Sequence, residues 1–339
     1  MLTKQYEYHL PEEAIAQTPV EPRDASRLLV INRNDSSVID RKFSDMADYF
    51  VAGDTLILNN TKVIGARLPG RLPGGGKCEI FLLKDVGSNS WEALVNPGRK
   101  MPVGTRVTIG SKIAIEIVSQ ADDGVRVVRF ENEQDVKAAL YDIGQVPLPP
   151  YIKTPITDPS RYQTIYASVE GSVAAPTAAL HFTSELLDKI KKKGVSIGFT
   201  TLHMGLGSFR PIKAEDLDLH VMPEEYVHVP TDVADMVNRA KLEGRRVVAC
   251  GTDVIRSLET AATGIGNIEP FAGPTRLFIK PGYQFKIIDM VITNLHLPRS
   301  SHLVLVSTFA GIDLVRQAYA YAIEKKFRFY TFGDATLII

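Results

Sequence analysis

The fold of this chain is decided by two neighbouring stretches, RYQTIYASVEGSVAAPTAALHFTSELL (residues 161–187) and GVSIGFTTLHMGLGSFR (residues 194–210). Each stretch holds a loop of small residues beside a histidine, GSVAAPTA before His181 and GLGS after His203. Glycine lets a ligand approach the backbone closely, and open α/β sheets bind ligands where a strand ends in such a loop. The two loops are therefore expected to face one crevice.

Between the two loops the pattern predicts a helix followed by a strand. Thr183 or Ser184 can cap the helix, and lysines 191–193 complement its carboxyl end before Gly194. The apolar run 195–202 then predicts a strand that delivers His203 into the second loop.

Composition indicates a soluble protein of about two domains. The 339 residues are 45% hydrophobic and 23% charged, and no apolar run is long enough to span a bilayer. The first residues have no apolar segment of the kind that directs secretion, and Cys78 and Cys250 have no metal-binding or disulfide spacing. These features predict a cytoplasmic protein without a membrane partner, and we expect a monomer.

The charge balance argues mildly against nucleic-acid binding. Lys plus Arg and Asp plus Glu number 39 each, whereas nonspecific nucleic-acid binders usually carry a basic excess. A local basic loop is still possible within a neutral total, and Arg99-Lys100 after Asn96-Pro97-Gly98 is the best candidate for phosphate contact.

Strand–helix alternation in residues 1–62 and 151–339 predicts a mixed α/β domain. Residues 63–150 differ, because six short β-rich runs recur there between Gly and Pro residues, followed by a helix at about 133–143. In one of these runs Ile113, Ile115 and Ile117 alternate with other residues, which is the pattern of a half-buried strand. The predicted fold class is therefore α/β, a discontinuous α/β catalytic domain with a smaller inserted all-β, barrel-like domain. Further strands are expected at 27–32, 246–250, 275–280 and 287–293. Helices are expected at 231–243, with Thr231 as its cap, and at 254–263, 300–310 and 313–325.

Polar groups follow four of the predicted apolar strands. They are Asn59-Asn60, His203 to Gly205, Gly251-Thr252 and Asn294 to His296. In a largely parallel sheet these strand ends share one edge, so they are expected to meet at a site.

Three histidines and four carboxylates are candidates for chemistry. His181, His203 and His296 can handle protons or bind a ligand, and each is equally compatible with a histidine that holds a loop. Glu225, Asp253, Asp289 and Asp334 are the candidates for a base or for a counter-charge to a cation, although a cap or a surface ion pair is the more usual role of each. His302 is expected to be structural. Neither a histidine pair with metal-ligand spacing nor a complete dinucleotide fingerprint is present, so no metal is expected.

Along nearly its full length the chain resembles the S-adenosylmethionine:tRNA ribosyltransferase-isomerases of queuosine biosynthesis. The motifs that carry the resemblance include RDASRLL at 23–29, NNTKVI at 59–64, ALVNPG at 93–98, PLPPYI at 147–152, GSVAAPTAALHFT at 171–183, TLHMGLGSFRP at 201–211, ITNLHLP at 292–298 and YTFGDA at 330–335.

The resemblance implies an unusual reaction. The family transfers and isomerises the ribosyl part of S-adenosylmethionine onto 7-aminomethyl-7-deazaguanine at the tRNA wobble position. Epoxyqueuosine remains on the tRNA, and adenine and methionine leave. Such a reaction needs a base beside the sulfonium, a donor for departing adenine, a neutral amine, exclusion of water and a splayed-out base.

The resemblance also implies roles for individual residues. Proton handling is assigned to His181, His203 and His296. Glu225 or Asp289 is expected to face the sulfonium, with Phe209 as an alternative cation–π partner. The remaining predicted substrate-binding residues orient polar edges, form the cradle or anchor phosphate and carboxylate groups: Asn59, Asn60, Lys62, Ser172, Thr177, Thr183, Gly205, Gly207, Arg210, Thr252, Arg256, Asn294 and Arg299.

Two positions depart from the family pattern. Pro223 stands where the family usually has a second histidine, and Asp253 stands where a small hydroxyl residue is usual. Pro223 removes a side-chain donor, and Asp253 adds negative charge near the expected site. One alternative is therefore a catalytically weakened paralogue that binds RNA or a nucleotide. A second alternative, a methyltransferase, is disfavoured by the missing glycine-rich fingerprint.

Overall fold

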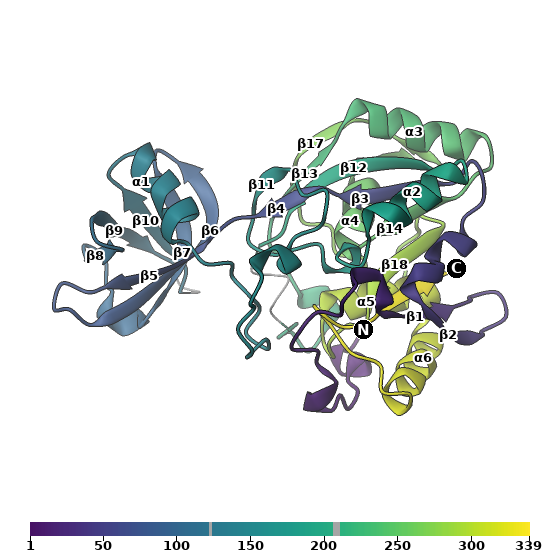
Figure 1. Cartoon of the computed structure of the whole chain (residues 1–339), viewed down its shortest axis with the longest axis horizontal. Coiled ribbons are helices and arrows are strands. Elements are labelled where there is room, and N and C mark those ends of the chain that lie inside the picture. Colours follow the sequence, from purple (N-terminus) through teal and green to yellow (C-terminus); the bar gives the residue numbers. More distant parts are fainter. Residues whose placement is uncertain (122–123, 206–210) are drawn as a thin grey trace.

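The computed structural model describes residues 1–121, 124–205 and 211–339, and it consists of two parts. A small closed barrel lies at one end of the molecule and a larger α/β part at the other (Figure 1). The barrel is formed by a single stretch of chain, which leaves the larger part after β4 (Thr61–Val63) and returns to it before β11 (Val169–Ser172).

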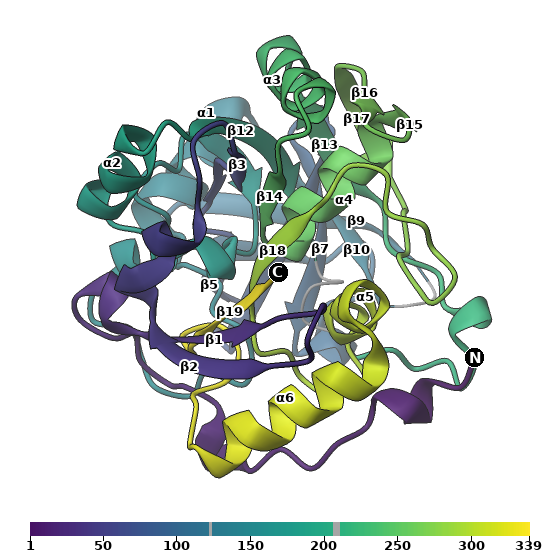
Figure 2. The same ribbon diagram turned by 90° about the vertical axis from the view of Figure 1, so that its right-hand side faces the viewer.

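The larger part is built on a mixed sheet of nine strands (Figure 2). In their order across the sheet they are β17 (Phe271–Thr275), β13 (Glu225–Val229), β12 (Ser196–His203), β3 (Thr55–Asn59), β14 (Val247–Cys250), β18 (Met290–Asn294), β19 (Ala335–Ile338), β1 (Arg27–Ile31) and β2 (Val38–Lys42).

The four central strands β12, β3, β14 and β18 are mutually parallel. Their carboxyl ends therefore lie along one edge of the sheet, as the positions of the polar residues predicted. The outer strands β13 and β19 run antiparallel to this central group. The predicted α/β class with an inserted barrel is confirmed.

Alternating side chains of the central strands enter two separate cores. Ile57 belongs to one core, and its neighbours Leu56 and Leu58 belong to the other. This alternation follows from the two-residue period of a strand, and burial of both faces explains why the strand is apolar throughout. The helices that contribute to these cores are α2 (Ser184–Lys192), α3 (Thr231–Leu242), α4 (Thr252–Ala261), α5 (Ser301–Ala310) and α6 (Ile312–Glu324).

The inserted part is a closed six-stranded antiparallel barrel, as the β-rich runs predicted. Alternation along Ile113, Ile115 and Ile117 puts these three side chains inside the barrel. The helix α1 (Glu133–Ala138) and a π-helical turn (Ala139–Ile143) follow the last strand. The barrel strands are β5 (Arg67–Arg71), β6 (Lys77–Gly87), β7 (Ser90–Asn96), β8 (Arg106–Ile109), β9 (Ile113–Gln120) and β10 (Arg126–Phe130).

Short elements complete the described chain. They are β15 (Ala262–Gly264), β16 (Asn267–Ile268) and the 3-10 turns at Thr3–Tyr6, Glu12–Ala14, Arg23–Ala25, Phe43–Tyr49, Gly98–Lys100, Pro159–Tyr162, Thr177–Ala179 and Leu217–Leu219.

Two predicted strands have different bounds in the structure, and side chains explain both differences. The strand expected at 275–280 lies instead at Phe271–Thr275, and the expected residues after Thr275 are not a strand. Side chains hold the backbone there, because Thr275 Oγ1 accepts the N–H of Leu277 and Arg256 binds the Leu277 carbonyl. The strand expected from 287 begins at Met290, because the Glu259 carboxylate accepts the backbone N–H groups just before it.

One predicted helix cap was wrong. Thr231 is the first residue of α3, and Pro230 is the residue at the cap position, with no side-chain hydrogen bond to the helix. Thr183 does cap α2, since its hydroxyl accepts the N–H of Leu186.

No single helix in the described ranges is long and apolar enough to cross a bilayer. Among the helices of the described residues, α5 and α6 pass such a test by length and composition only as a pair, and they are bent by 114° relative to one another.

The chain passes between the barrel and the larger part twice, and Gly65 and Gly144 allow these two connecting segments to pack closely against each other. A Cβ at position 144 would lie 1.9 Å from the Gly65 carbonyl oxygen. Because the obstacle is backbone, we expect Gly144→Ala to destabilise the protein by about 1–3 kcal/mol in urea unfolding. Gly74→Ala is the matched control, since a Cβ there has no neighbour within 4 Å. An equal midpoint for both variants would contradict the prediction.

Candidate active site

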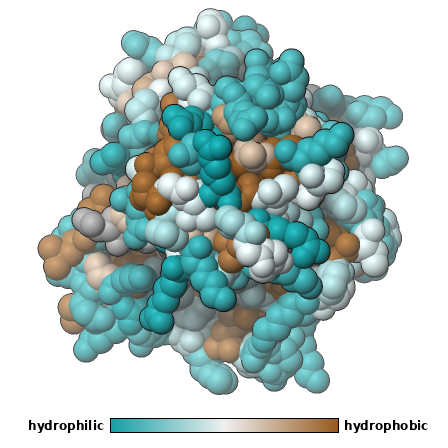
Figure 3. Space-filling model, turned by 90° about the vertical axis from the view of Figure 1, so that its left-hand side faces the viewer, coloured by the Kyte–Doolittle hydropathy of each residue, from teal (hydrophilic) through white to brown (hydrophobic). Residues whose placement is uncertain are grey.

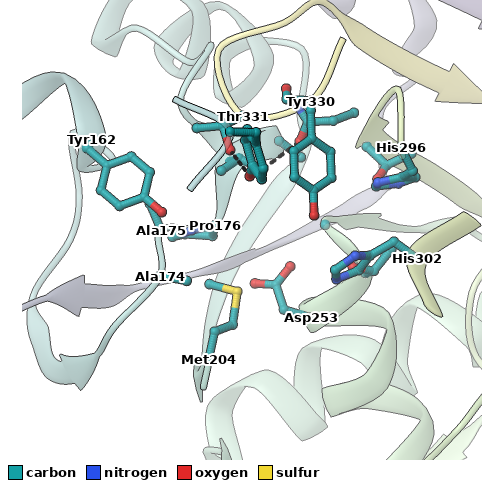
Figure 4. A pocket seen from close by; sticks show the side chains of 17 residues that line it. Tyr162, Ala174, Ala175, Pro176, Met204, Asp253, His296, His302, Tyr330 and Thr331 are labelled. Carbon is teal, nitrogen blue, oxygen red and sulfur yellow. Dashed lines mark hydrogen bonds between the residues drawn. The ribbon is translucent and has the colours of Figure 1, made fainter. Parts of the chain in front are cut away.

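A pocket lies at the carboxyl edge of the central strands, and 17 residues line it (Figure 4). The space is about 50 Å³, enough for only a small part of a ligand. Met204, Thr252, Asp253, Asn294 and His296 come from the ends of β12, β14 and β18. The 174–178 loop and aromatic residues from 151, 162 and 330 close the other sides.

The turn between β14 and α4 brings a carboxyl group to the pocket. Gly251 has a φ of 100°, which favours glycine, and a Cβ there would lie 2.0 Å from Asp253 Oδ1. Asp253 is in the first turn of α4, where backbone N–H groups favour a carboxylate. In Figure 4 its carboxyl group points into the space between Met204, Tyr330 and His302.

Asn59 holds this carboxyl group in place. Asn59 Nδ2 donates to Asp253 Oδ2 at 2.5 Å and to the Leu202 carbonyl at 3.1 Å. Asn59 Oδ1 accepts the N–H groups of Thr61 and Leu202. One fully buried amide thus joins the ends of β3 and β12 to the start of α4.

Burial raises the pKa of Asp253 to about 6, and the nearby Glu225 carboxylate adds to the increase. The hydrogen bonds from Asn59 and from the backbone at 253 and 254 oppose it. The carboxyl group therefore changes charge close to neutral pH.

Two stacked histidines line the same pocket. The rings of His296 and His302 lie 5.3 Å apart at 23°, and His296 Nε2 lies 2.8 Å from Thr293 Oγ1. Burial lowers the pKa of His302 to about 4 and the pKa of His296 well below its usual value. Both imidazoles are therefore neutral at pH 7.

The small-residue loop is fixed by hydrogen bonds at both ends. Ser172 Oγ donates to the Ala174 carbonyl and accepts the N–H of Met204, which joins the loop to the end of β12. Thr177 Oγ1 donates to Asn294 Oδ1 at 2.8 Å, which joins the loop to the end of β18. The two loops predicted from sequence to face one crevice are thus connected at Met204.

A larger cleft of about 990 Å³ lies between the barrel and the α/β part. Trp91 and Tyr141 line it from the barrel side, and His203 and Tyr226 line it from the sheet side. The rings of His203 and Tyr226 are stacked 6.1 Å apart, and burial lowers the pKa of His203. Met204 lines both the cleft and the pocket, so the two spaces are neighbours.

A buried ion pair between Glu225 and Arg256 holds in place residues that line the cleft. Arg256 Nη1 donates to Glu225 Oε2, and both side chains are less than a tenth exposed. Glu225 Oε1 accepts the N–H of Gly205 at 3.1 Å, and Arg256 Nε donates to the Leu277 carbonyl. Glu225 thereby joins the end of β12 to α4.

Comparison with known proteins identifies the family. The model of the family described as queuosine biosynthesis protein matches residues 3–338. The chain belongs to the queuosine biosynthesis protein family. Proteins from Carboxydothermus hydrogenoformans and Halothermothrix orenii named S-adenosylmethionine:tRNA ribosyltransferase-isomerase are 49% and 47% identical to it, over the whole of both chains in each case.

A solved structure supports the same assignment. The crystal structure of an S-adenosylmethionine tRNA ribosyltransferase from Thermotoga maritima is 36% identical to this queuosine biosynthesis protein. The match covers 99% of this chain and 100% of the other, with a TM-score of 0.58. The family resemblance read from the sequence motifs is confirmed.

The structure brings part of the predicted site together. Thr177, Thr252, Asn294 and His296 line the pocket, and Asn59 and Ser172 position residues that line it. His203, Gly205 and Glu225 lie on the cleft. Asn60 accepts a hydrogen bond from Thr201, and Lys62 pairs with Glu170 at the cleft margin. Gly207, Phe209 and Arg210 lie outside the described residues.

Five predicted site residues are placed or engaged elsewhere. Asp289 precedes β18 at the opposite edge of the sheet, where it binds Lys241 and the N–H of Val247. The prediction that Asp289 faces the sulfonium is therefore corrected, because Asp289 lies away from the pocket and forms a structural ion pair with Lys241. Two of the other four hold local structure: His181 contacts Ser26 and Phe43, and Thr183 caps α2. The remaining two are in ion pairs: Arg256 pairs with Glu225, and Arg299 pairs with Glu7 and Glu215.

Sequence reasoning missed several residues that line the pocket. His302 was expected to be structural because it follows no glycine loop, but it lies in the first turn of α5, just after β18. That position, on the helix following a strand that ends at the site, is the signal that could have found it. Tyr151, Tyr162, Tyr330 and Thr331 come from distant irregular segments and carry no local pattern.

Over the described part of the chain, no group of three or more His, Cys, Asp or Glu residues is arranged to hold a metal ion. Asp334, another carboxylate considered above, accepts the N–H groups of Arg27 and Arg328 and is structural.

The buried pair of Glu225 and Arg256 gives a stability prediction. Glu225→Gln leaves a buried guanidinium without a counter-charge, so we expect a loss of about 3–5 kcal/mol in urea unfolding. The double variant Glu225→Gln/Arg256→Met should recover part of that loss. Glu224→Gln, which disrupts exposed pairs with Lys84 and Arg276, should leave the midpoint nearly unchanged. Equal effects of the two single variants would contradict this prediction.

Proposed function

We propose that this protein transfers and isomerises the ribosyl moiety of S-adenosylmethionine onto 7-aminomethyl-7-deazaguanine at the wobble position of tRNA. The products are epoxyqueuosine-tRNA, adenine and methionine. The observation that carries the proposal is the full-length match to named ribosyltransferase-isomerases, together with a pocket at the shared edge of four parallel strands.

The two adjoining spaces suit the two substrates. The cleft has room for a splayed-out base, and its aromatic side chains offer stacking surfaces. The small pocket is lined by aromatic and apolar side chains together with buried polar ones, and its small size limits the access of water to reactive intermediates. We place the reacting part of S-adenosylmethionine in the pocket, with the remainder extending past Met204 into the cleft.

Histidines supply the proton transfers in this proposal. His296, supported by its stacked partner His302, is neutral at pH 7 and is our candidate to remove a proton within the pocket. His203 is the candidate on the cleft side, where the incoming amine must be kept neutral. Asn294 and Thr177 orient polar edges of the ligand. S-Adenosylmethionine acts as co-substrate, and no metal takes part.

Product analysis tests the function. The protein is incubated with S-adenosylmethionine and tRNA carrying the aminomethyl-deazaguanine, and the products are separated by chromatography and mass spectrometry. We expect free adenine and methionine in equal amounts, with a matching mass gain on the tRNA. tRNA with unmodified guanine at the wobble position is the matched control.

Two other outcomes would overturn the proposed reaction. Intact S-adenosylmethionine with tRNA still bound would identify a binding paralogue. In that case Pro223, which lines the cleft and departs from the family pattern, is the first residue to replace. S-Adenosylhomocysteine as product would identify a methyltransferase.

We also propose that residues 63–150 act as an inserted tRNA-docking domain on a catalytic domain formed by 1–62 and 151–339. Seen from its outer end, the barrel side of the molecule is largely hydrophilic with apolar patches between (Figure 3). Arg99 and Lys100 are exposed on the turn after β7, and Arg106 is exposed nearby on β8. The protein is proposed to work in the cytoplasm as a monomer, which light scattering with and without tRNA would test.

Neutralising that turn should weaken tRNA binding. We expect Arg99→Ala/Lys100→Ala to lower tRNA affinity and to reduce the slope of log affinity against log salt by roughly 1–2, because each phosphate contact releases counterions. Lys191→Ala/Lys192→Ala, on exposed positions of α2 in the α/β part, removes the same charge and is the control. Identical salt slopes for the two double variants would rule out docking through this turn.

A further inference from the structure

The charges that line the pocket are unusual for a site that must accept a nucleoside derivative. Of its described lining residues, Asp253 is the one acidic group, and none is Lys or Arg. Three tyrosines, Tyr151, Tyr162 and Tyr330, line the same space. A carboxylate beside several aromatic rings is the chemistry that binds a cation which has no N–H to donate.

A sulfonium is such a cation. It carries a full positive charge and no hydrogen-bond donor, so a protein can distinguish it from the neutral thioether only through charge and ring faces. We propose that Asp253 sets the preference of this pocket for the sulfonium of S-adenosylmethionine over the thioether of S-adenosylhomocysteine. This inference rests on the proposed function, and it concerns a residue that the proton transfers proposed above do not use.

The position of the carboxyl group is fixed before any ligand arrives. Asn59 holds Oδ2, and backbone N–H groups at 253 and 254 also bind the carboxyl group, so it points into the pocket rather than toward bulk water (Figure 4). Asp253 is 6% exposed, and the low dielectric around it strengthens attraction to a bound cation. Preorganisation also means that little side-chain entropy is lost on binding.

The other titratable groups around Asp253 do not mask its charge near neutral pH. Burial lowers the pKa of His302 and of His296, so both are uncharged. Burial raises the pKa of Tyr330 to about 12 and the pKa values of Tyr166 and Cys250 well above their usual values, so these groups are uncharged too. The remaining charged neighbours are Glu225 and Arg256, which pair with each other.

The sign of the pH dependence follows from these surroundings. With a pKa of about 6, Asp253 is mostly neutral at pH 5 and mostly charged at pH 7.5. A bound sulfonium favours the charged form, so binding at pH 6 releases a proton. The preference for the sulfonium should therefore rise from pH 5 to pH 7.5, whereas binding of the thioether should change little through this group.

Calorimetric titration with the two ligands tests the inference. For the unmodified protein at pH 7.5 we expect S-adenosylmethionine to bind roughly tenfold tighter than S-adenosylhomocysteine, with this ratio falling at pH 5. Titrations at pH 6 in two buffers of different ionisation enthalpy should show proton release with S-adenosylmethionine alone. The same experiment on Asp253→Asn should give a ratio near one, independent of pH, and no proton release.

Two controls separate this role from general damage. Asp235→Asn makes the same chemical change on an exposed position of α3 and should keep the full preference and proton release. Affinity for S-adenosylhomocysteine reports whether the pocket of Asp253→Asn is still formed. An asparagine at 253 keeps the size of the side chain and places no uncompensated charge in the pocket.

The possible failures are distinguishable. If Asp253→Asn lost affinity for both ligands equally, or kept the full preference and proton release, Asp253 would not be the determinant. If the unmodified protein bound neither ligand while remaining folded, the proposed function itself would fail.

Discussion

The buried side chain of Asn59 is the contact on which the arrangement of the site depends. It makes hydrogen bonds with Thr61, with both backbone groups of Leu202 and with Asp253, so every polar atom of the amide has a partner. A buried amide that is fully paired specifies geometry strongly, because any shift of β3 relative to β12 or α4 would leave a donor or acceptor unsatisfied. The pocket inherits its shape from that constraint.

Desolvation then determines the chemistry of the pocket. The same enclosure lowers the pKa of His296 and His302 and raises the pKa of Asp253, because burial disfavours whichever form is charged. The imidazoles become neutral acceptors and the carboxyl group becomes easily protonated. One physical cause therefore yields two neutral imidazoles and a carboxyl group that titrates near neutral pH.

The architecture could be predicted from sequence because it follows from local patterns. Alternation at Ile113, Ile115 and Ile117 identified a barrel strand, and the apolar run before Asn59 identified a central strand of the sheet. Convergence of the polar strand ends followed from parallel pairing. The predicted strand ends were wrong where a side chain distant in sequence binds the backbone N–H or carbonyl groups, as Glu259 does just before β18. No local sequence pattern carries that information.

The site was harder to predict because its members come together only in the folded chain. Thr177, Thr252, Asn294 and His296 could be found because each lies in or beside a strand end or the small-residue loop. Tyr151 and Tyr330 could not, since their rings reach the pocket from segments that are far apart in the sequence and pack against each other 4.5 Å apart. Asp289 misled because the expected strand at 287–293 contained it, whereas β18 begins at Met290 and leaves Asp289 at the amino end, away from the pocket.

The position of Asp253 shows how one side chain can change a pocket whose backbone is set by others. Gly251 provides the turn, Asn59 provides the hydrogen bond, and α4 provides N–H groups, so the geometry at position 253 does not depend on the carboxylate itself. What the carboxylate contributes is charge in a space otherwise lined by neutral groups. A substrate that is itself a cation gains from that charge while it is bound and loses the gain once the sulfonium becomes a neutral thioether. The carboxylate therefore favours the charged substrate over the neutral methionine that leaves, and it assists release of product as much as capture of substrate.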